Sequence, residues 1–401
     1  MKHRVLLSVL LAIVLVFFLF HSSAFAKESI RIGFSISLTG IYSQAAVSQF
    51  NAYQLWKDDV NGKGGIFLKD LGKKLPVEFV YYDDKSSADT AVKVYEKLIT
   101  KDKIDLIFTP WGATIHFAVV PLAGRYKMPM IGNTASSIQL RKMAHPYIWF
   151  VTPIYWDRLA ATTVPFLQSL NIKKVAIIYV QDLAPRECLQ FMKRELEKVK
   201  IDIVLLRDYP IGVKDMTTLL TNIKSKNPEA LLSLSYPADS FLITKQAQGI
   251  MLNPPLFYAL IGPSIAAYGH VFGEATEGIA TMGYWSPEAG WPGAKEFEAR
   301  YKKKWKIRPD YLDSIETYIS CQIMEQAIER AGSLDREKIR DIIAGEEFST
   351  ITGPVRFTGI ENLVTPPGVL QYQKGNLALV WPPKSATAKP IYPKPPWPKQ
   401  K

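Results

Sequence analysis

The sequence predicts an α/β protein built from two doubly wound lobes. Short apolar runs of four to seven residues alternate with amphipathic helical stretches of 10–15 residues. Such runs are typical of parallel strands that helices cover on both faces. The alternation occurs twice, once before about residue 150 and once after it. Because ligands of doubly wound sheets lie at the carboxyl ends of the strands, the loops that follow strands are the first candidates for a site.

The first series begins at residue 30 and supplies one lobe. Its apolar runs are rich in β-branched and aromatic residues, and its helical stretches repeat apolar residues at intervals of three or four. The predicted strands are 30–36, 77–82, 104–108 and 129–131, and the predicted helices are 44–60 and 88–99.

The second series repeats this pattern and is followed by a mixed C-terminal portion. Its predicted strands are 175–179, 201–206, 230–234 and 256–260, and its helices are 158–170, 187–199, 216–224 and 239–248. After residue 279 come helices at 294–305, 312–331 and 336–344 and short strands near 355–357, 369–372 and 377–380. This arrangement predicts a chain that crosses between the lobes more than once.

The first 26 residues have the composition of a secretory signal peptide. Lys2 and Arg4 precede an apolar run at 5–20, and Ala24-Phe25-Ala26 forms a small-residue cleavage site. The run is shorter than the roughly 20 residues that a membrane span needs. We therefore expect cleavage after Ala26, export to the periplasm, and a mature chain that does not span the membrane.

The net charge is concentrated at the C-terminus. The 401-residue chain carries a formal charge of +12, and removal of the signal peptide leaves +10. Segment 382–401 supplies half of this, with seven prolines, five lysines and no acidic residue. Because proline cannot continue a helix or a central strand, we predict an extended or disordered, solvated tail. Charge in such a tail gives little reason to expect a nucleic-acid partner.

Two small polar turns follow strands of the first series. Trp111-Gly112-Ala113-Thr114 opens a helix after strand 104–108, and segment 132–137 repeats the arrangement after strand 129–131. The free amide groups at such a helix start favour a carboxylate or another anion. Thr114 offers a hydroxyl donor and Trp111 an aromatic wall, so these turns predict one side of a binding site.

The sequence arranges no catalytic or metal centre. His116, His145 and His270 have no partner at the spacing of a catalytic triad or a metal site, and the GxSxG motif is absent. We therefore expect no enzyme, no metal and no cofactor. Cys188 and Cys321 fall in different segments, and we interpret them as two buried free thiols.

Several N-terminal motifs occur together in a fixed order. They are Ile30–Gly40, Asp59–Gly62, Gly64-Gly65-Ile66, Tyr82-Asp83-Asp84 and Ala91 with Leu98-Ile99. Behind a secretion signal, this set resembles the Leu/Ile/Val-binding family, the type I periplasmic solute-binding proteins of ABC transporters. The resemblance covers nearly all of residues 29–381 and is most specific in the N-terminal third. It implies two lobes joined by a three-strand hinge, which close over a small ligand and deliver it to an ABC permease.

The resemblance also implies domain boundaries and an oligomeric state. The first lobe is expected to hold residues 27–150 plus about 281–352, and the second 151–280 plus about 353–381, followed by the Pro/Lys-rich tail 382–401. Receptors of this family act as monomers, and we expect a monomer here.

Ten ligand-binding residues follow from the turns, the aromatic residues at strand ends and the resemblance. They are Trp111, Ala113, Thr114, Thr134, Ala135, Ser136, Tyr155, Trp156, Tyr236 and Ser264. Asp157 is expected at the first crossover.

Departures from the family pattern bear on the ligand. Ala113 stands where amino-acid binders have a serine, and an aromatic residue expected near Ala184 is missing. Gly262-Pro263-Ser264 lacks the glutamate that pairs with an α-ammonium group. Because a buried ammonium without a counter-charge is costly, we expect an aromatic or apolar carboxylate, or an amide-like solute. A true branched-chain amino acid binder and a ligand-sensing module for a signalling partner remain the alternatives.

Overall fold

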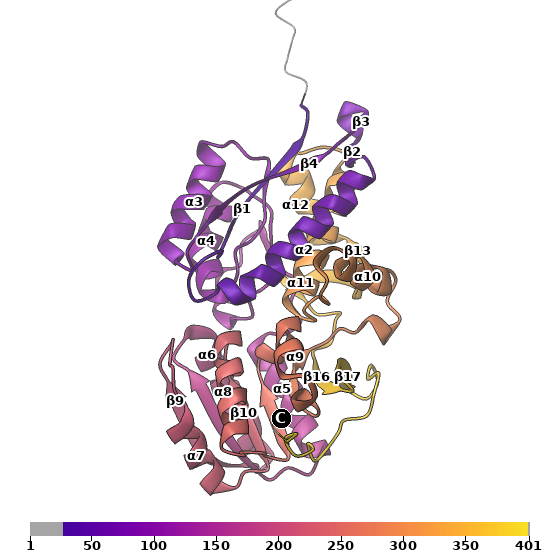
Figure 1. The fold of residues 1–401 in the computed structure, drawn as a ribbon. Helices are drawn as coiled ribbons and strands as arrows, with labels where there is room; N and C mark the ends of the chain where they lie inside the picture. The colour runs from indigo at the N-terminus through magenta and orange to yellow at the C-terminus, as the bar shows by residue number, and fades with distance from the viewer. Residues whose placement is uncertain (1–26, 400–401) are drawn as a thin grey trace, which may run out of the picture.

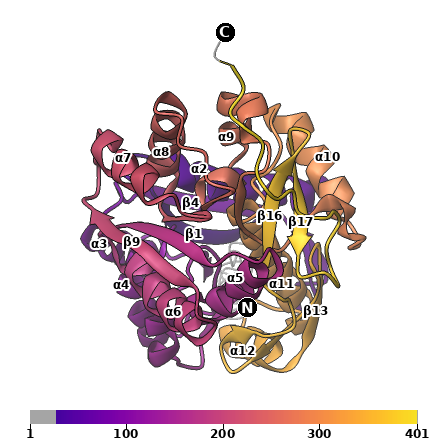
Figure 2. The ribbon, with the colours of Figure 1, turned by 90° about the horizontal axis from the view of Figure 1, so that it is seen from below.

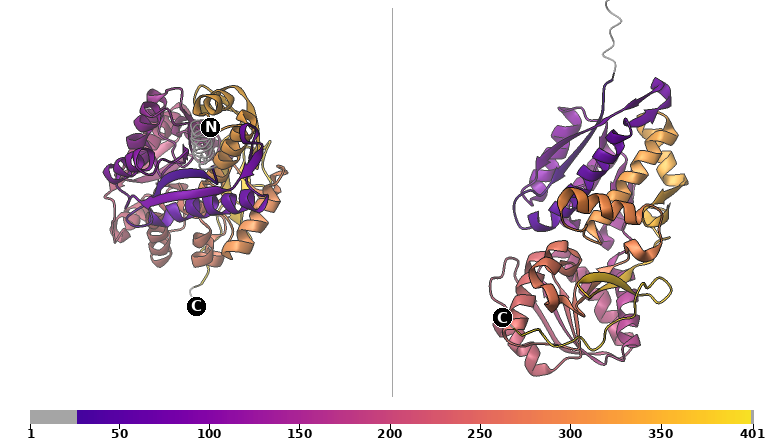
Figure 3. Two further views of the ribbon diagram at one scale, coloured as in Figure 1. Left: turned by 90° about the horizontal axis from the view of Figure 1, so that it is seen from above. Right: turned by 45° about the vertical axis from the view of Figure 1, so that its right-hand side comes forward.

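The computed structural model describes residues 27–399, which form two lobes stacked end to end (Figure 1). The predicted signal peptide and its cleavage site lie outside the described residues. A second direction of view separates the same two lobes (Figure 3). The predicted α/β fold with two doubly wound lobes is confirmed.

The first lobe combines the N-terminal portion of the chain with a later segment. Its elements are β1 (Ile30–Ile36), α2 (Ser43–Gly62), β2 (Ile66–Leu68), η1 (Lys69–Leu71), β3 (Lys73–Leu75), β4 (Val77–Asp83), α3 (Ala88–Thr100), β5 (Leu106–Ile107), α4 (Ala113–Arg125), β6 (Met130–Gly132), η2 (Ile138–Met143), β7 (Ile148–Phe150), α10 (Ala294–Trp305), α11 (Asp313–Ala331), α12 (Arg336–Gly345), β13 (Glu347–Thr350), β14 (Gly353–Thr358) and β15 (Glu361–Asn362).

The strands of this lobe form two main sheets and a small hairpin. One sheet has the order β4-β1-β5 and is parallel, and the other has the order β13-β14-β15-β7-β6. The hairpin pairs β2 with β3. Helix α3 packs against α4, and α2 packs against α11. Buried apolar side chains of β1 fill the space between these layers, because every residue of β1 except Arg31 is buried.

The second lobe contains a single seven-stranded sheet. Its elements are α5 (Trp156–Ser169), β8 (Lys174–Val180), α6 (Leu183–Lys198), β9 (Asp202–Tyr209), α7 (Thr217–Lys226), β10 (Ala230–Leu234), α8 (Pro237–Gly249), β11 (Leu256–Ala259), η3 (Gly262–Ser264), α9 (Ala266–Phe272), η4 (Gly273–Thr276), β12 (Ala280–Gly283), β16 (Gly368–Gln373) and β17 (Asn376–Trp381).

This sheet has the order β17-β16-β12-β11-β10-β8-β9. Strands β8 to β12 are parallel, whereas β16 and β17 join antiparallel at one edge. Figure 2 shows α5 and α6 on one face of the sheet and α7 and α8 on the other. The β10 side chains are buried along the whole strand, as expected of a strand covered on both faces.

Three segments cross between the lobes, at residues 151–155, 284–293 and 363–367, and the second contains η5 (Pro287–Ala289). The third crossing lies later than we predicted. We placed residues from about 353 onward in the second lobe, but β14 pairs with β15, and β15 pairs with β7 of the first lobe. The strand pattern near 355 indicated a strand correctly but carried no information about its partner.

The predicted solvated tail is also corrected. Residues 382–399 contain no helix or strand, yet they pack along the second lobe. The Trp397 indole N–H donates to the Leu252 carbonyl over 2.8 Å, and the Lys394 amide donates to the Pro255 carbonyl over 2.7 Å. Trp397 is buried against Phe257, with 5.9 Å between ring centroids, so its large apolar surface holds the tail in place.

The two cysteines are free and buried, as predicted. Cys188 lies in α6 of the second lobe and Cys321 in α11 of the first.

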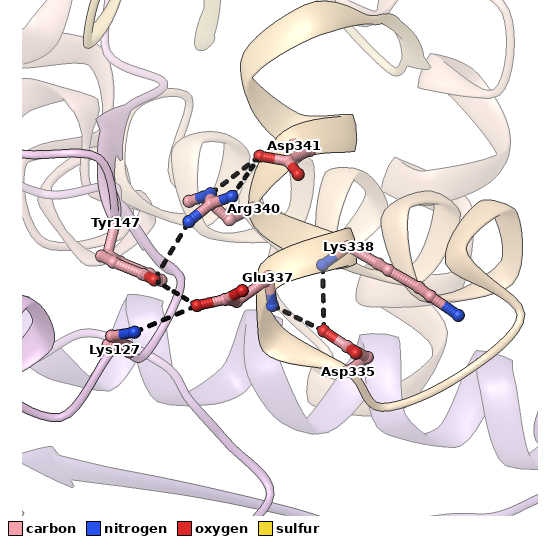
Figure 4. Close-up of polar contacts among 7 residues, drawn as sticks. All are labelled: Lys127, Tyr147, Asp335, Glu337, Lys338, Arg340 and Asp341. Carbon is pink, nitrogen blue, oxygen red and sulfur yellow. Dashed lines mark hydrogen bonds and ion pairs between the residues drawn. The ribbon is translucent and has the colours of Figure 1, made fainter.

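Polar contacts fasten α12 to the rest of the first lobe (Figure 4). Asp335 caps the helix, because its carboxylate accepts the amide groups of Glu337 and Lys338 over 2.9 and 3.1 Å. The Glu337 carboxylate accepts from Lys127, which follows α4, over 3.1 Å. Arg340 donates to the hydroxyl of Tyr147, beside β7, over 3.1 Å.

Candidate ligand-binding site

A cavity lies between the two lobes. Both lobes contribute to its wall. The lining residues are Tyr42, Trp111, Gly112, Ala113, Thr114, Thr134, Ser136, Trp156, Ala184, Tyr236, Ile261, Met282, Leu312, Asp313 and Glu316.

The first lobe presents the N-terminal end of α4 to this cavity. The chain turns at Gly112, whose φ of 83° and ψ of 148° suit glycine alone. Within the described chain, no side chain caps α4, so the amide groups of its first turn are available to a ligand. The positive end of the helix dipole acts in the same direction. With the Thr114 hydroxyl beside it, this part of the cavity favours a carboxylate or an amide oxygen.

A second turn, after β6, brings Thr134 and Ser136 to the same cavity. The Thr134 hydroxyl oxygen accepts the Gly112 amide over 3.2 Å and thereby joins the two turns. Behind them, the buried Asn133 side chain donates to the Tyr53 hydroxyl over 2.9 Å. Because these hydrogen bonds fix the loops to the first lobe, the polar wall is in place before a ligand arrives.

Aromatic rings from both lobes form the apolar walls. Trp156 begins α5, and Tyr236 directly precedes α8. The Tyr236 ring centroid lies 6.2 Å from that of Trp111 and 6.0 Å from that of Tyr42. The Tyr236 ring contacts these two rings edge to face, and together they give the cavity an aromatic wall for an apolar group.

Two carboxylates reach the cavity from α11. Asp313 and Glu316 are buried and lie one helical turn apart. The Trp111 indole N–H donates to Asp313 over 2.8 Å, whereas Glu316 Oε1 has no hydrogen-bond partner among residues 27–399. Burial raises the pKa of both carboxyl groups well above the ordinary range, and the neighbouring Asp310 carboxylate adds to the rise.

Seven of the ten predicted binding residues line the cavity, namely Trp111, Ala113, Thr114, Thr134, Ser136, Trp156 and Tyr236. The other three are buried and are not among the lining residues. Ala135 follows Thr134 in the same turn, and the Ser264 hydroxyl donates to the Ile261 carbonyl over 2.8 Å. Tyr155 lies beneath the Arg141 guanidinium, 4.3 Å from its ring centroid.

Sequence reasoning missed the lining residues Tyr42, Ile261, Met282 and Leu312 and the two carboxyl groups of α11. A signal for the carboxylates was present, since residues 313 and 316 are acidic positions three apart at the start of a helix whose other early residues are uncharged. Buried acidic residues are rare unless they are paired or serve a ligand. They correct our expectation that the site offers no counter-charge to an ammonium group.

A cluster of charged side chains marks the first crossover. Asp157, expected at this place, accepts two hydrogen bonds from the Arg141 guanidinium, over 2.6 and 3.1 Å. The same guanidinium donates to Glu361 over 3.0 Å. Arg141 and Glu361 belong to the first lobe and Asp157 begins the second, so this cluster joins the lobes at the hinge.

Comparison with known proteins adds to this geometry. The model of the family described as "Periplasmic binding protein" matches residues 29–373. The chain belongs to the type I periplasmic binding protein family. Members of this family are solute-binding receptors and not enzymes.

The relatives of this periplasmic binding protein cover nearly its whole length at low identity. The "Leu/Ile/Val-binding protein homolog 7" of Brucella melitensis is 21% identical over 403 residues, which cover 96% of this chain and 98% of that protein. LivJ of Streptococcus pneumoniae, solved with isoleucine, has a TM-score of 0.77 and 22% identity, covering 87% of this chain and 98% of that one. A solute-binding protein of R. palustris, solved with benzoate, has a TM-score of 0.79 and 18% identity, covering 91% and 98%.

The part of this periplasmic binding protein that the structure describes, residues 27–399, holds no helix with the length and apolar character of a membrane span.

Proposed function

We propose that this periplasmic binding protein captures a small solute by hinge closure and delivers it to an ABC permease of the branched-chain amino acid type. The observation that supports the proposal is one cavity lined by both lobes around an uncapped helix end. A solute that contacts both lobes stabilises the closed arrangement relative to an open one, and closure is then the state that a permease recognises. The protein acts in the periplasm, as a monomer and not as an enzyme, after cleavage behind Ala26.

The solute has an apolar or aromatic body and a carboxylate or amide-like end. The amide groups of α4 and the hydroxyl groups of Thr114 and Ser136 suit the polar end, and Trp111, Trp156 and Tyr236 suit the body. Isoleucine and benzoate, the ligands of two structural neighbours, both carry a carboxylate on an apolar body.

Mass spectrometry tests this proposal first. The mature chain 27–401 is purified and denatured, and the released small molecules are identified. The identified solute is then titrated by calorimetry, and small-angle scattering follows the radius of gyration. We expect saturable binding with a fall in the radius of gyration. Unchanged scattering across a broad solute library, without binding heat, would refute capture by closure.

Delivery requires a separate measurement. An ABC permease of the branched-chain amino acid type is reconstituted in vesicles, and its ATP hydrolysis is measured with the solute-free protein and with the solute-loaded protein. Stimulation by the loaded protein supports transport. Turnover of the solute by the purified protein contradicts the receptor function.

A further inference from the structure

The acidic and basic side chains that line the cavity are all carboxyl groups. Asp313 and Glu316 lie in its wall, and among the described residues that line it none is Lys, Arg or His. A solute that carried only negative charge would therefore be buried beside two carboxyl groups with no cationic side chain in contact. Such burial is costly in a medium of low dielectric constant.

Two neighbouring arginines are engaged elsewhere. Arg308 donates to the carbonyl groups of Ser264 and Pro309 over 2.9 and 2.8 Å and to the Tyr372 hydroxyl over 2.8 Å. Arg141 is held by the hinge carboxylates described above. Neither arginine forms a hydrogen bond or ion pair with the carboxylates of the cavity in the described chain.

The cavity also holds an unpartnered acceptor and an unpartnered donor. Glu316 is 2% exposed and Trp156 is 3% exposed. Neither Glu316 Oε1 nor the Trp156 indole nitrogen has a hydrogen-bond partner among residues 27–399. Buried polar groups without partners are rare in folded proteins, and their presence in the wall of a cavity points to a ligand that supplies both a donor and an acceptor.

We infer that Asp313 and Glu316 form a subsite for a protonated nitrogen of the solute, an ammonium or an amidinium group. The inference rests on the proposed function and specifies its substrate class. The solute is then a zwitterion, or a cation with an amide-like end, on an apolar body. Trp111 supports the same subsite, because its indole N–H fixes Asp313 and an aromatic face attracts a cation.

The position of this subsite has a mechanistic consequence. Both α4 and α11 belong to the first lobe. The resemblance placed the counter-charge on the second lobe, at the position of Ser264, where this chain has none. The first lobe therefore contacts both polar ends of the solute, and the second lobe supplies the aromatic cover and the Trp156 N–H.

Matched solutes test the inference. Phenylalanine is compared with 3-phenylpropanoate, which lacks the amino group, and with phenethylamine, which lacks the carboxylate. Leucine is compared with 4-methylpentanoate, which lacks the amino group. Each solute, together with any solute released on denaturation, is titrated into the mature chain by calorimetry. We expect the amine-bearing members to bind more tightly than their amine-free acids. Glu316→Gln should weaken binding of the amine-bearing members about thirtyfold or more, and leave amine-free acids unchanged or tighter.

Two further variants separate binding from folding. Glu329→Gln changes an exposed carboxylate of the same helix and should alter neither affinity nor melting temperature. Asp313→Asn keeps an acceptor for the Trp111 N–H but removes the acidic group. Like Glu316→Gln, it should weaken binding of the amine-bearing solutes and not of the amine-free acids. Without solute, the melting temperature of Glu316→Gln should equal or exceed that of the unchanged protein, because the substitution removes a buried carboxylate.

The outcomes distinguish the two proposals. The cation subsite is wrong if amine-free acids bind as tightly as the matching amine-bearing solutes, or if Glu316→Gln weakens binding of the two classes equally. It is also wrong if Glu316→Gln strongly lowers the melting temperature of the solute-free protein. A released solute without a basic nitrogen also overturns it, while leaving the receptor function intact. Failure of every member to bind, with no solute released, overturns the receptor function itself.

Discussion

The hydroxyl group of Tyr42, in the first lobe, donates a hydrogen bond to the Asp182 carboxylate of the second lobe over 3.1 Å. Tyr236 of the second lobe donates to the same oxygen atom over 2.8 Å. Both tyrosines line the cavity, so one carboxylate connects the rims of the two lobes. Because Tyr42 and Asp182 lie on different lobes, their hydrogen bond forms only when the lobes are closed.

Removal of this bond should shift the protein toward the open state. Tyr42→Phe keeps the ring beside Trp111 and removes only the donor. We expect solute affinity to fall about tenfold or more, because one hydrogen bond to a charged group contributes about 1.5–3 kcal/mol. Scattering without solute should show a larger radius of gyration.

Tyr82→Phe provides the matched control. Its hydroxyl donates to the Asp102 carboxylate over 3.1 Å within the first lobe. This variant should leave both affinity and radius of gyration unchanged. Equal behaviour of Tyr42→Phe and Tyr82→Phe would mean that the contact between the lobes does not contribute to closure.

Gly112 should resist substitution because of its backbone conformation. Its φ of 83° and ψ of 148° lie in a region that only glycine occupies without strain, although an added Cβ meets no atom within 4 Å. Gly112→Ala should lower the free energy of unfolding by about 1–3 kcal/mol. It should also weaken binding of a carboxylate end, since the peptide that opens α4 must move.

Gly345→Ala is the comparison for this substitution. Gly345 ends α12, has no positive φ, and an added Cβ there also meets no atom within 4 Å. Alanine at this position should leave stability unchanged or raise it by a few tenths of a kcal/mol. Urea unfolding of both variants measures the difference, and equal midpoints would argue against strain at Gly112.

His116 should make the fold sensitive to mild acid. Its Nδ1 lies 2.9 Å from the Gly112 carbonyl oxygen, which only accepts, so we assign the proton of the neutral ring to Nδ1. Burial lowers the pKa of His116 to about 4, from an ordinary value near 6.5. Between these two values the unfolded chain binds a proton that the folded chain does not, so stability falls as pH drops through this window. The loss is about 3 kcal/mol at pH 4.

His116→Asn removes the titrating group and keeps a donor near the Nδ1 position. Compared with the unchanged protein, this variant should lose less stability between pH 6.5 and pH 4 in urea unfolding. His270→Asn changes an exposed histidine and should follow the unchanged protein. The same pH dependence in His116→Asn and the unchanged protein would contradict a buried neutral His116.

Local sequence signals located most elements of this fold. The bounds of β1, β10 and α10 agree with the predicted ranges, because each is a regular apolar pattern between clear turn residues. The two polar turns of the first lobe were also located, since a helix start after a strand follows from nearby residues alone. These features depend on contacts within a few residues.

Features that depend on distant contacts could not be predicted. The pairing of β15 with β7 joins Glu361 to Phe150, and no local pattern selects that partner. Glu316 was counted as part of a helix, because its place in the cavity depends on how α11 packs against the first lobe. The hydrogen bond between Tyr42 and Asp182 likewise requires both lobes in position.

The C-terminal tail should contribute to the stability of the second lobe through one anchor. Trp397 is 6% exposed, donates to the Leu252 carbonyl, and carries the Lys394 ammonium 3.5 Å above its ring centroid. Trp397→Ala should lower the free energy of unfolding by about 2–3 kcal/mol, less than for a core tryptophan because the released tail gains conformational freedom.

Lys399→Ala, at an exposed position two residues on, is the control and should change the free energy of unfolding little. Neither variant should alter solute affinity, because no tail residue lines the cavity in the described structure. A urea midpoint for Trp397→Ala equal to that of Lys399→Ala would show that the packed tail is not held by this side chain.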